Sequence, residues 1–197
     1  MTTNAVNAFA NNLPANVSDY AAARRALARA ATGSNTPFLK MGKDGVWVYG
    51  AEEITVKPTE EWRVNPFTFR VGVVGWAGGS KVGEEMYILG EGTVNKAALP
   101  EILSVKQGDG WKDQLSIELV SVTNPDLVLQ FATSSKGGKD AIGKLADALN
   151  SHGDDTEHPI VNCVTTFYIH QQYGKTYTPD FSIVRWEGAA KPKRKLV

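Results

Sequence analysis

The chain has 197 residues, of which 42% are hydrophobic and 21% are charged, a balance typical of globular proteins. Its 21 Lys and Arg residues match its 21 Asp and Glu residues, so the net charge is zero and no overall positive field attracts nucleic acid. Any nucleic-acid binding must therefore come from a local patch. No apolar run reaches the roughly 18 residues of a membrane helix, and the N-terminus does not resemble a secretory signal. We therefore expect a soluble, cytoplasmic protein with no membrane partner.

The two ends of the chain differ in composition from the middle. Residues 20–31 are rich in Ala and Arg and predict a short N-terminal helix. The last ten residues are basic and predict a disordered tail. We therefore divide the chain into an N-terminal arm with a short helix (1–36), one β-rich domain (37–187) and a basic tail (188–197).

Within the central domain, the alternation of apolar residues predicts many short strands. Residues 67–74 alternate with a period of two, which is typical of a strand. Residues 115–119 and 127–131 alternate on both sides of an Asn-Pro-Asp turn and predict a hairpin. Further short strands are predicted at 46–49, 54–56 and 84–89.

One clear helix interrupts these strands at about 135–150. Ala141, Ile142 and Leu145 lie at helical spacing after two serines that can cap the first turn. Short antiparallel strands with one inserted helix indicate a mainly β (α+β) fold. We expect an OB-like small barrel or a strongly curved antiparallel sheet, with a β-sandwich as the alternative.

A strand pair near the C-terminus combines aromatic and polar residues. Its alternation places Phe167, Ile169, Phe181 and Ile183 in the core, and the neighbouring Tyr168 and His170 on the opposite face. Between the strands, residues 173–177 (Tyr-Gly-Lys-Thr-Tyr) predict a hairpin tip that presents two rings and one ammonium together.

No segment predicts catalysis. Residues 133–139 (Thr-Ser-Ser-Lys-Gly-Gly-Lys) are only superficially similar to a phosphate-binding loop, because Thr133 stands where the first glycine belongs and Asp140 follows Lys139. The zinc-capable donors do not show the spacing of close ligand pairs; they are His152, His158, Cys163 and His170, near Asp154 and Asp155. We therefore expect no enzyme, no metal and no cofactor, with a nucleotide-handling enzyme centred on Lys139 as a third hypothesis.

The aromatic and basic residues give a stronger indication. Bases stack on exposed rings while phosphates bind nearby cations, so interleaved rings and cations favour single-stranded nucleic acid. The same rings are also what a β-core needs. The candidate nucleic-acid-binding residues are Lys40, Lys43, Trp47, Tyr49, Trp62, Arg63, Arg70, Trp76, Lys136, Lys139, Tyr173, Lys175 and Tyr177.

Several short motifs resemble a family of small tailed-phage proteins associated with single-stranded DNA binding. The resemblance covers about residues 37–187, and the basic C-terminus departs from the acidic, partner-recruiting tail of many such proteins. The motifs are Phe38-Leu39-Lys40-Met41, Gly45-x-Trp47-x-Tyr49-Gly50, Trp62-x-Val64-Asn65-Pro66, Trp76, Trp111, residues 133–138, and Tyr173-Gly174-Lys175-x-Tyr177-Thr178-Pro179-x-Phe181.

The leading hypothesis is a sequence-tolerant single-stranded DNA-binding protein with an OB-like fold. The resemblance implies a role in phage DNA replication or recombination in the bacterial host cytoplasm, with phage or host replication and recombination proteins as partners. The alternative is a protein–protein interaction module, a phage structural component or an inhibitor of a host factor, that uses exposed aromatics as anchors. The sequence leaves the oligomeric state open, including a homo-oligomer.

Overall fold

A computed structural model describes residues 36–103, 106–154, 156–172 and 174–188. Within these ranges, residues Pro37–Glu187 form one compact unit. The predicted N-terminal helix, Tyr173 and nearly all of the basic tail lie outside the described residues.

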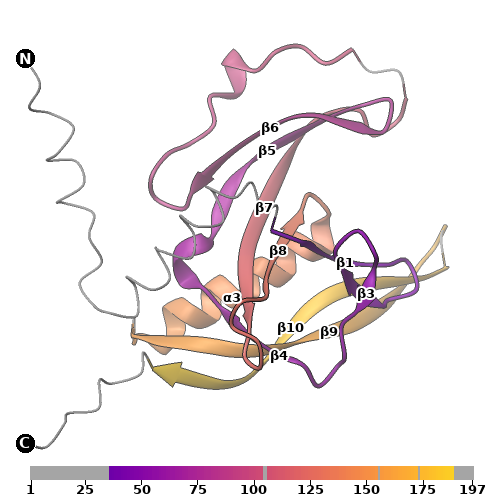
Figure 1. The fold of residues 1–197 in the computed structure, drawn as a ribbon. Coiled ribbons are helices and arrows are strands. Elements are labelled where there is room, and N and C mark those ends of the chain that lie inside the picture. Colours follow the sequence, from indigo (N-terminus) through magenta and orange to yellow (C-terminus); the bar gives the residue numbers. More distant parts are fainter. Residues whose placement is uncertain (1–35, 104–105, 155, 173, 189–197) are drawn as a thin grey trace, which may run out of the picture. The chain divides into compact units, whose positions relative to one another are not determined.

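Within this unit, the described residues form a single, strongly curled sheet with one inserted α-helix (Figure 1). Along its main path the strand order is β10-β9-β4-β7-β8-β1-β2-β3, and β5 joins β6 to β7. The predicted class, mainly β with a strongly curved sheet, is confirmed. The strands are β1 (Phe38–Met41), β2 (Trp47–Tyr49), β3 (Ile54–Thr55), β4 (Glu61–Val64), β5 (Arg70–Ala77), β6 (Ser80–Ile88), β7 (Gly110–Ser121), β8 (Val128–Thr133), β9 (Glu157–His170) and β10 (Gly174–Gly188).

The sheet is mixed, and not wholly antiparallel as the sequence predicts. β1 pairs with β8 in parallel, with Leu39 opposite Phe131. Parallel neighbours need a long crossover connection, and here nearly the whole middle of the chain separates β1 from β8. Alternation within each strand shows which face is buried but carries no information about the direction of a distant partner.

The long strand β7 organises the sheet. β8 pairs with one of its edges, and β4 and β5 share the other edge, so the sheet forks there. The 3-10 helix η1 (Pro66–Thr68) separates β4 from β5, with the Asn65 side chain accepting a hydrogen bond from the Phe67 backbone. The strand predicted at 67–74 therefore begins three residues late, and Phe67 is exposed while Phe69 is buried.

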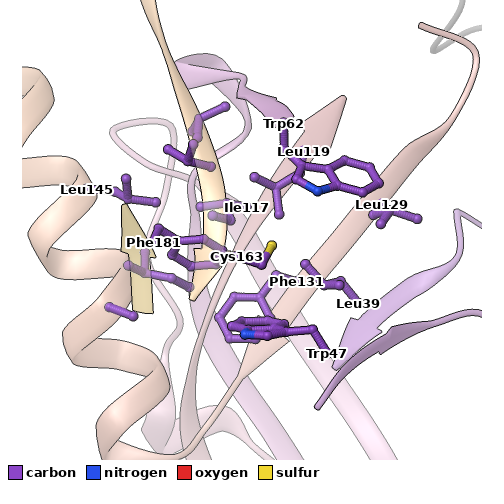
Figure 2. Packing of buried hydrophobic residues seen from close by; sticks show 14 of the residues in the cluster. Leu39, Trp47, Trp62, Ile117, Leu119, Leu129, Phe131, Leu145, Cys163 and Phe181 are labelled. Carbon is purple, nitrogen blue, oxygen red and sulfur yellow. The ribbon is translucent and has the colours of Figure 1, made fainter. Parts of the chain in front are cut away.

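The curl of the sheet brings the turn before β2 against β9. Trp47 Nε1 donates a hydrogen bond to the Val164 carbonyl (3.1 Å), and Thr165 Oγ1 donates one to the Gly45 carbonyl (2.7 Å). Inside the curl, the rings of Trp47, Phe131 and Phe181 meet with centroids 5.4–5.6 Å apart. Figure 2 shows these rings in the core beside Cys163 and the aliphatic side chains.

The helix α3 (Lys136–His152) confirms the predicted helix at about 135–150. The Ser135 side chain accepts a hydrogen bond from the Gly138 backbone N–H, and Gly153 ends the helix in the left-handed conformation. Ala141, Ile142 and Leu145 are buried in the core cluster. The apolar stripe of α3 therefore covers part of the core that the curled sheet leaves open.

The two buried tryptophans of the core provide a matched test of one hydrogen bond. Trp47 donates to Val164, whereas Trp62 Nε1 is buried without a hydrogen-bond partner among the described residues. Phenylalanine removes the same atoms at either site. We expect Trp47→Phe to cost about 1–2 kcal/mol more stability than Trp62→Phe, because it alone breaks a hydrogen bond and leaves a carbonyl unsatisfied.

Urea unfolding followed by circular dichroism measures both variants against the parent protein. Equal losses of stability in the two variants would show that the Trp47–Val164 hydrogen bond contributes nothing measurable.

Candidate nucleic-acid interface

The strands β9 and β10 are longer than the core that they border. The end of β9 at His170 and the start of β10 at Gly174 lie at the right of Figure 1. β4 pairs with β9 at Ile160–Asn162, near the other end of β9. We call residues 166–170 and 174–178 the β9–β10 ribbon. Because it extends past the core, side chains on both of its faces meet solvent.

Hydroxyl contacts establish which residues share a face of the ribbon. The hydroxyl groups of Thr166 and Thr178 lie 2.6 Å apart, so these two residues are cross-strand neighbours. Successive residues of a strand point to opposite faces. Phe167 and Tyr177 therefore lie together on the other face, and their ring centroids are 6.4 Å apart.

Lys175 lies against both of these rings. Its Nζ is 4.3 Å from the centroid of the Phe167 ring and 4.7 Å from that of Tyr177. Phe167 is 58% exposed and Lys175 is exposed, while Tyr177 is half-buried. Two aromatic rings and one ammonium thus form a compact exposed group, which we call the Phe167 face.

Two further predicted cations lie near the base of the ribbon. Gly45 packs so closely against Tyr177 that a Cβ there would come within 2.8 Å of the ring, and Lys43 is two residues away. A Cβ at Gly137 would come within 2.9 Å of the Thr178 methyl group, and Lys136 is its neighbour in sequence. The fold therefore packs the segments that carry Lys43 and Lys136 against the strand pair that carries Lys175.

The prediction that Phe167 and Ile169 are core residues is wrong. They continue the inward phase of β9, but the core ends near Thr165, and Ile169 is 71% exposed. Phe181 is buried and Ile183 packs against the core, as predicted. A sequence signal for the exposed end exists, since the 14 residues of β9 far exceed the usual strand length of about 5–6.

Two of the predicted stacking residues are buried and offer no ring face to a base. Trp47 is 4% exposed and Trp62 is fully buried. Tyr49 is half-buried, and its ring contacts the ring of Trp62 edge-on. The curl of the sheet turns these rings inward, so Trp47 and Trp62 belong to the core and not to a binding surface.

Two of the predicted cations already have acidic partners. Lys40 pairs with Glu53 at 2.7 Å, and Arg63 pairs with Glu187 at 2.6 Å. Arg185 joins the second pair by binding both Glu61 and Glu187.

These contacts shift the pKa values of the groups in that second network. The hydrogen bond from Arg185 lowers the pKa of Glu61, and those from Arg63 and Arg185 lower the pKa of Glu187. The same carboxylates raise the pKa of Arg185, with Glu61 contributing most. This network links β4 to β10 across β9, which lies between them, and makes Arg63 a poor phosphate ligand.

Three other predicted residues belong to a different part of the sheet or its surroundings. Arg70 and Trp76 lie on β5, which pairs with β6 and β7 and not with the ribbon. The pKa of Asp113 on β7 is lowered mainly by its hydrogen bond with Lys96, and the positive charge of Lys139 lowers it further. Tyr173 lies outside the described residues. The sequence groups Arg70, Trp76 and Lys139 with the ribbon residues only because both sets are aromatic or basic.

The glycines that are similar to a phosphate-binding loop have a packing role. A Cβ at Gly138 would lie 2.2 Å from Thr133 Oγ1, so the first turn of α3 requires a glycine there.

Among the histidines, His152 hydrogen-bonds Glu157 and stacks on Trp186 with 3.7 Å between ring centroids. The described residues contain no cluster of three or more His, Cys, Asp or Glu that could hold a metal ion.

The cysteine is buried in the core. Burial raises the pKa of the Cys163 thiol to about 12, so the thiol stays protonated near neutral pH. A protonated and inaccessible thiol is a weak nucleophile. This agrees with a structural role for the residue.

Comparison with protein families, curated proteins and solved structures gives no match to this chain. Within the described residues, no helix has the length and apolar character needed to span a membrane. Any functional proposal therefore depends on the geometry of the ribbon and on the chemistry of its side chains.

Proposed function

We propose that the protein binds single-stranded DNA without sequence preference and without catalysing a reaction, through the β9–β10 ribbon. The observation that supports this most directly is the Phe167 face, where the Lys175 ammonium lies 4.3 and 4.7 Å from two ring centroids. Every base has an aromatic face, so stacking on Phe167 and Tyr177 tolerates any sequence. The ammonium is within reach of the phosphate that joins stacked bases.

The charge distribution supports a modest electrostatic contribution. The protein is neutral overall, so attraction depends on the three lysines around the ribbon, Lys43, Lys136 and Lys175. Each phosphate that a cation neutralises on a single strand contributes about −0.7 to the slope of log affinity against log salt concentration. Three contacts predict a slope of about −2.

Titration of a fluorescent oligo-dT at several salt concentrations tests this function. We expect affinity to fall roughly 20-fold between 50 and 200 mM salt, because binding at three phosphates releases counterions and this release is less favourable at higher salt. Lys175→Gln should make the slope shallower by about 0.7. As a control, Lys96→Gln removes a cation that pairs with Asp113 on β7, away from the ribbon, and should leave the slope unchanged.

Two outcomes would contradict the proposal. They are an absence of binding at 50 mM salt, and binding that does not respond to salt. The sequence motifs resemble those of a phage family associated with DNA replication or recombination. A protein with that role would need to bind single-stranded DNA at physiological salt.

The second candidate function is a protein–protein interaction module. Ile169 is an exposed aliphatic side chain on the Phe167 face, and Phe38 and Ile54 are also exposed apolar side chains. Aliphatic side chains serve protein interfaces but offer no stacking surface to a base. If the oligo-dT titration shows no binding, this module becomes the favoured function.

A further inference from the structure

The ribbon has a second aromatic face. Tyr168 follows Phe167 in β9 and therefore points to the opposite side, where Thr166 and Thr178 meet. It is 48% exposed, and the His170 ring lies edge-on to it with centroids 6.2 Å apart. We call Tyr168, His170 and these threonines the Tyr168 face.

Three properties of the Tyr168 face match those of the Phe167 face. An exposed ring is the main feature of each, and each ring has an aromatic neighbour. Each face also has a lysine on an adjoining segment. Gly45 packs on Tyr177 with Lys43 two residues away, and Gly137 packs on Thr178 with Lys136 next to it in sequence. Rings that are about half exposed on both sides of a two-stranded ribbon gain much less packing energy from the fold than buried rings do. Their placement is better explained by a ligand than by stability.

Resting on the proposed function, we propose that the ribbon binds bases on both faces, with Tyr168 as the stacking residue of the second face. The two rings point to opposite sides of the strand pair, so they take bases from separate segments of single-stranded nucleic acid. The lysine on the segment adjoining each face of the ribbon favours a phosphate-bearing ligand over an apolar one. One protein then holds two segments, either from one strand or from two.

A set of substitutions at Tyr168 tests whether its ring stacks on a base. Tyr168→Leu keeps apolar bulk on an exposed strand position but removes the aromatic ring. For a labelled oligo-dT long enough to contact both faces, we expect affinity to fall roughly 5- to 160-fold. Tyr168→Phe keeps the ring and should keep the affinity. Val184→Ala changes another exposed side chain, on β10 and beyond the ribbon, and should have no effect.

Stoichiometry provides a second measurement. With oligo-dT short enough to occupy one face, calorimetric titration should give two oligonucleotides per wild-type protein and one per Tyr168→Leu protein. Circular dichroism melting of each variant verifies that it is folded. The same titration with oligo-U shows whether DNA and RNA share the two faces.

The outcomes separate this inference from the proposed function. If the wild-type protein binds no oligonucleotide, the proposed function itself is wrong. If it binds one short oligonucleotide and Tyr168→Leu binds equally well, the function stands and the second face is wrong. If Tyr168→Phe loses as much affinity as Tyr168→Leu, the hydroxyl group and not the ring is responsible, which also overturns the inference.

Discussion

Replacing both rings of the Phe167 face with leucine is expected to weaken oligo-dT binding by about 2–6 kcal/mol, since each stacked base contributes about 1–3 kcal/mol. The double variant Phe167→Leu with Tyr177→Leu keeps the apolar volume of the ribbon and removes both π-faces. It also releases the Lys175 ammonium from its two ring contacts. The measurement is a fluorescence anisotropy titration at 50 mM salt.

The control for this variant is the same substitution elsewhere on the surface. Phe38→Leu replaces an exposed phenylalanine on β1, so it tests whether any exposed ring contributes equally. We expect its affinity to match that of the parent protein. If the Phe38 variant loses as much affinity as the ribbon variant, the stacking surface is not confined to the ribbon.

The largest effect on stability is expected from Phe181→Ala, at about 3–5 kcal/mol. Phe181 is 8% exposed, and its ring contacts those of Trp47 and Phe131. Truncation leaves a cavity at the point where β10 joins the core, and the surrounding rings are too rigid to fill it. Urea unfolding measures the loss as a lower midpoint with an unchanged slope.

Phe167→Ala is the matched comparison on the paired strand. Its exposed ring contacts Tyr177 and Lys175, so we expect a stability loss of no more than about 1 kcal/mol. The two variants should thus differ in what they lose: Phe181→Ala should lose stability, and Phe167→Ala should lose binding affinity. Comparable stability losses would indicate that the ribbon is packed against the rest of the protein and is not free to bind a ligand.

The predictions made from local pattern agree with the structure wherever the pattern depends on near neighbours. Ser135, the apolar stripe of α3 and Gly153 define a helix through contacts within a few residues. The hairpin of β7 and β8 follows from alternation and a short turn. By contrast, the parallel pairing of β1 with β8 depends on residues about 90 positions apart, and no local signal carries it.

The candidate site shows the same division. The sequence identifies Lys43, Lys136, Lys175 and Tyr177 as binding candidates but cannot separate them from Trp47 and Trp62, because an aromatic residue on a strand serves a core and a ligand equally well. The structure makes the distinction by burial. It also adds Phe167, which strand phase alone places in the core.

By itself, the sequence determines the mainly β class, the single inserted helix and the neutral overall charge, because composition and short-range periodicity carry these properties. Only the tertiary structure decides where the core ends along β9 and β10. Alternation states which face of a strand a residue occupies, but the curl of the sheet decides whether that face is covered at Phe181 or open to solvent at Phe167.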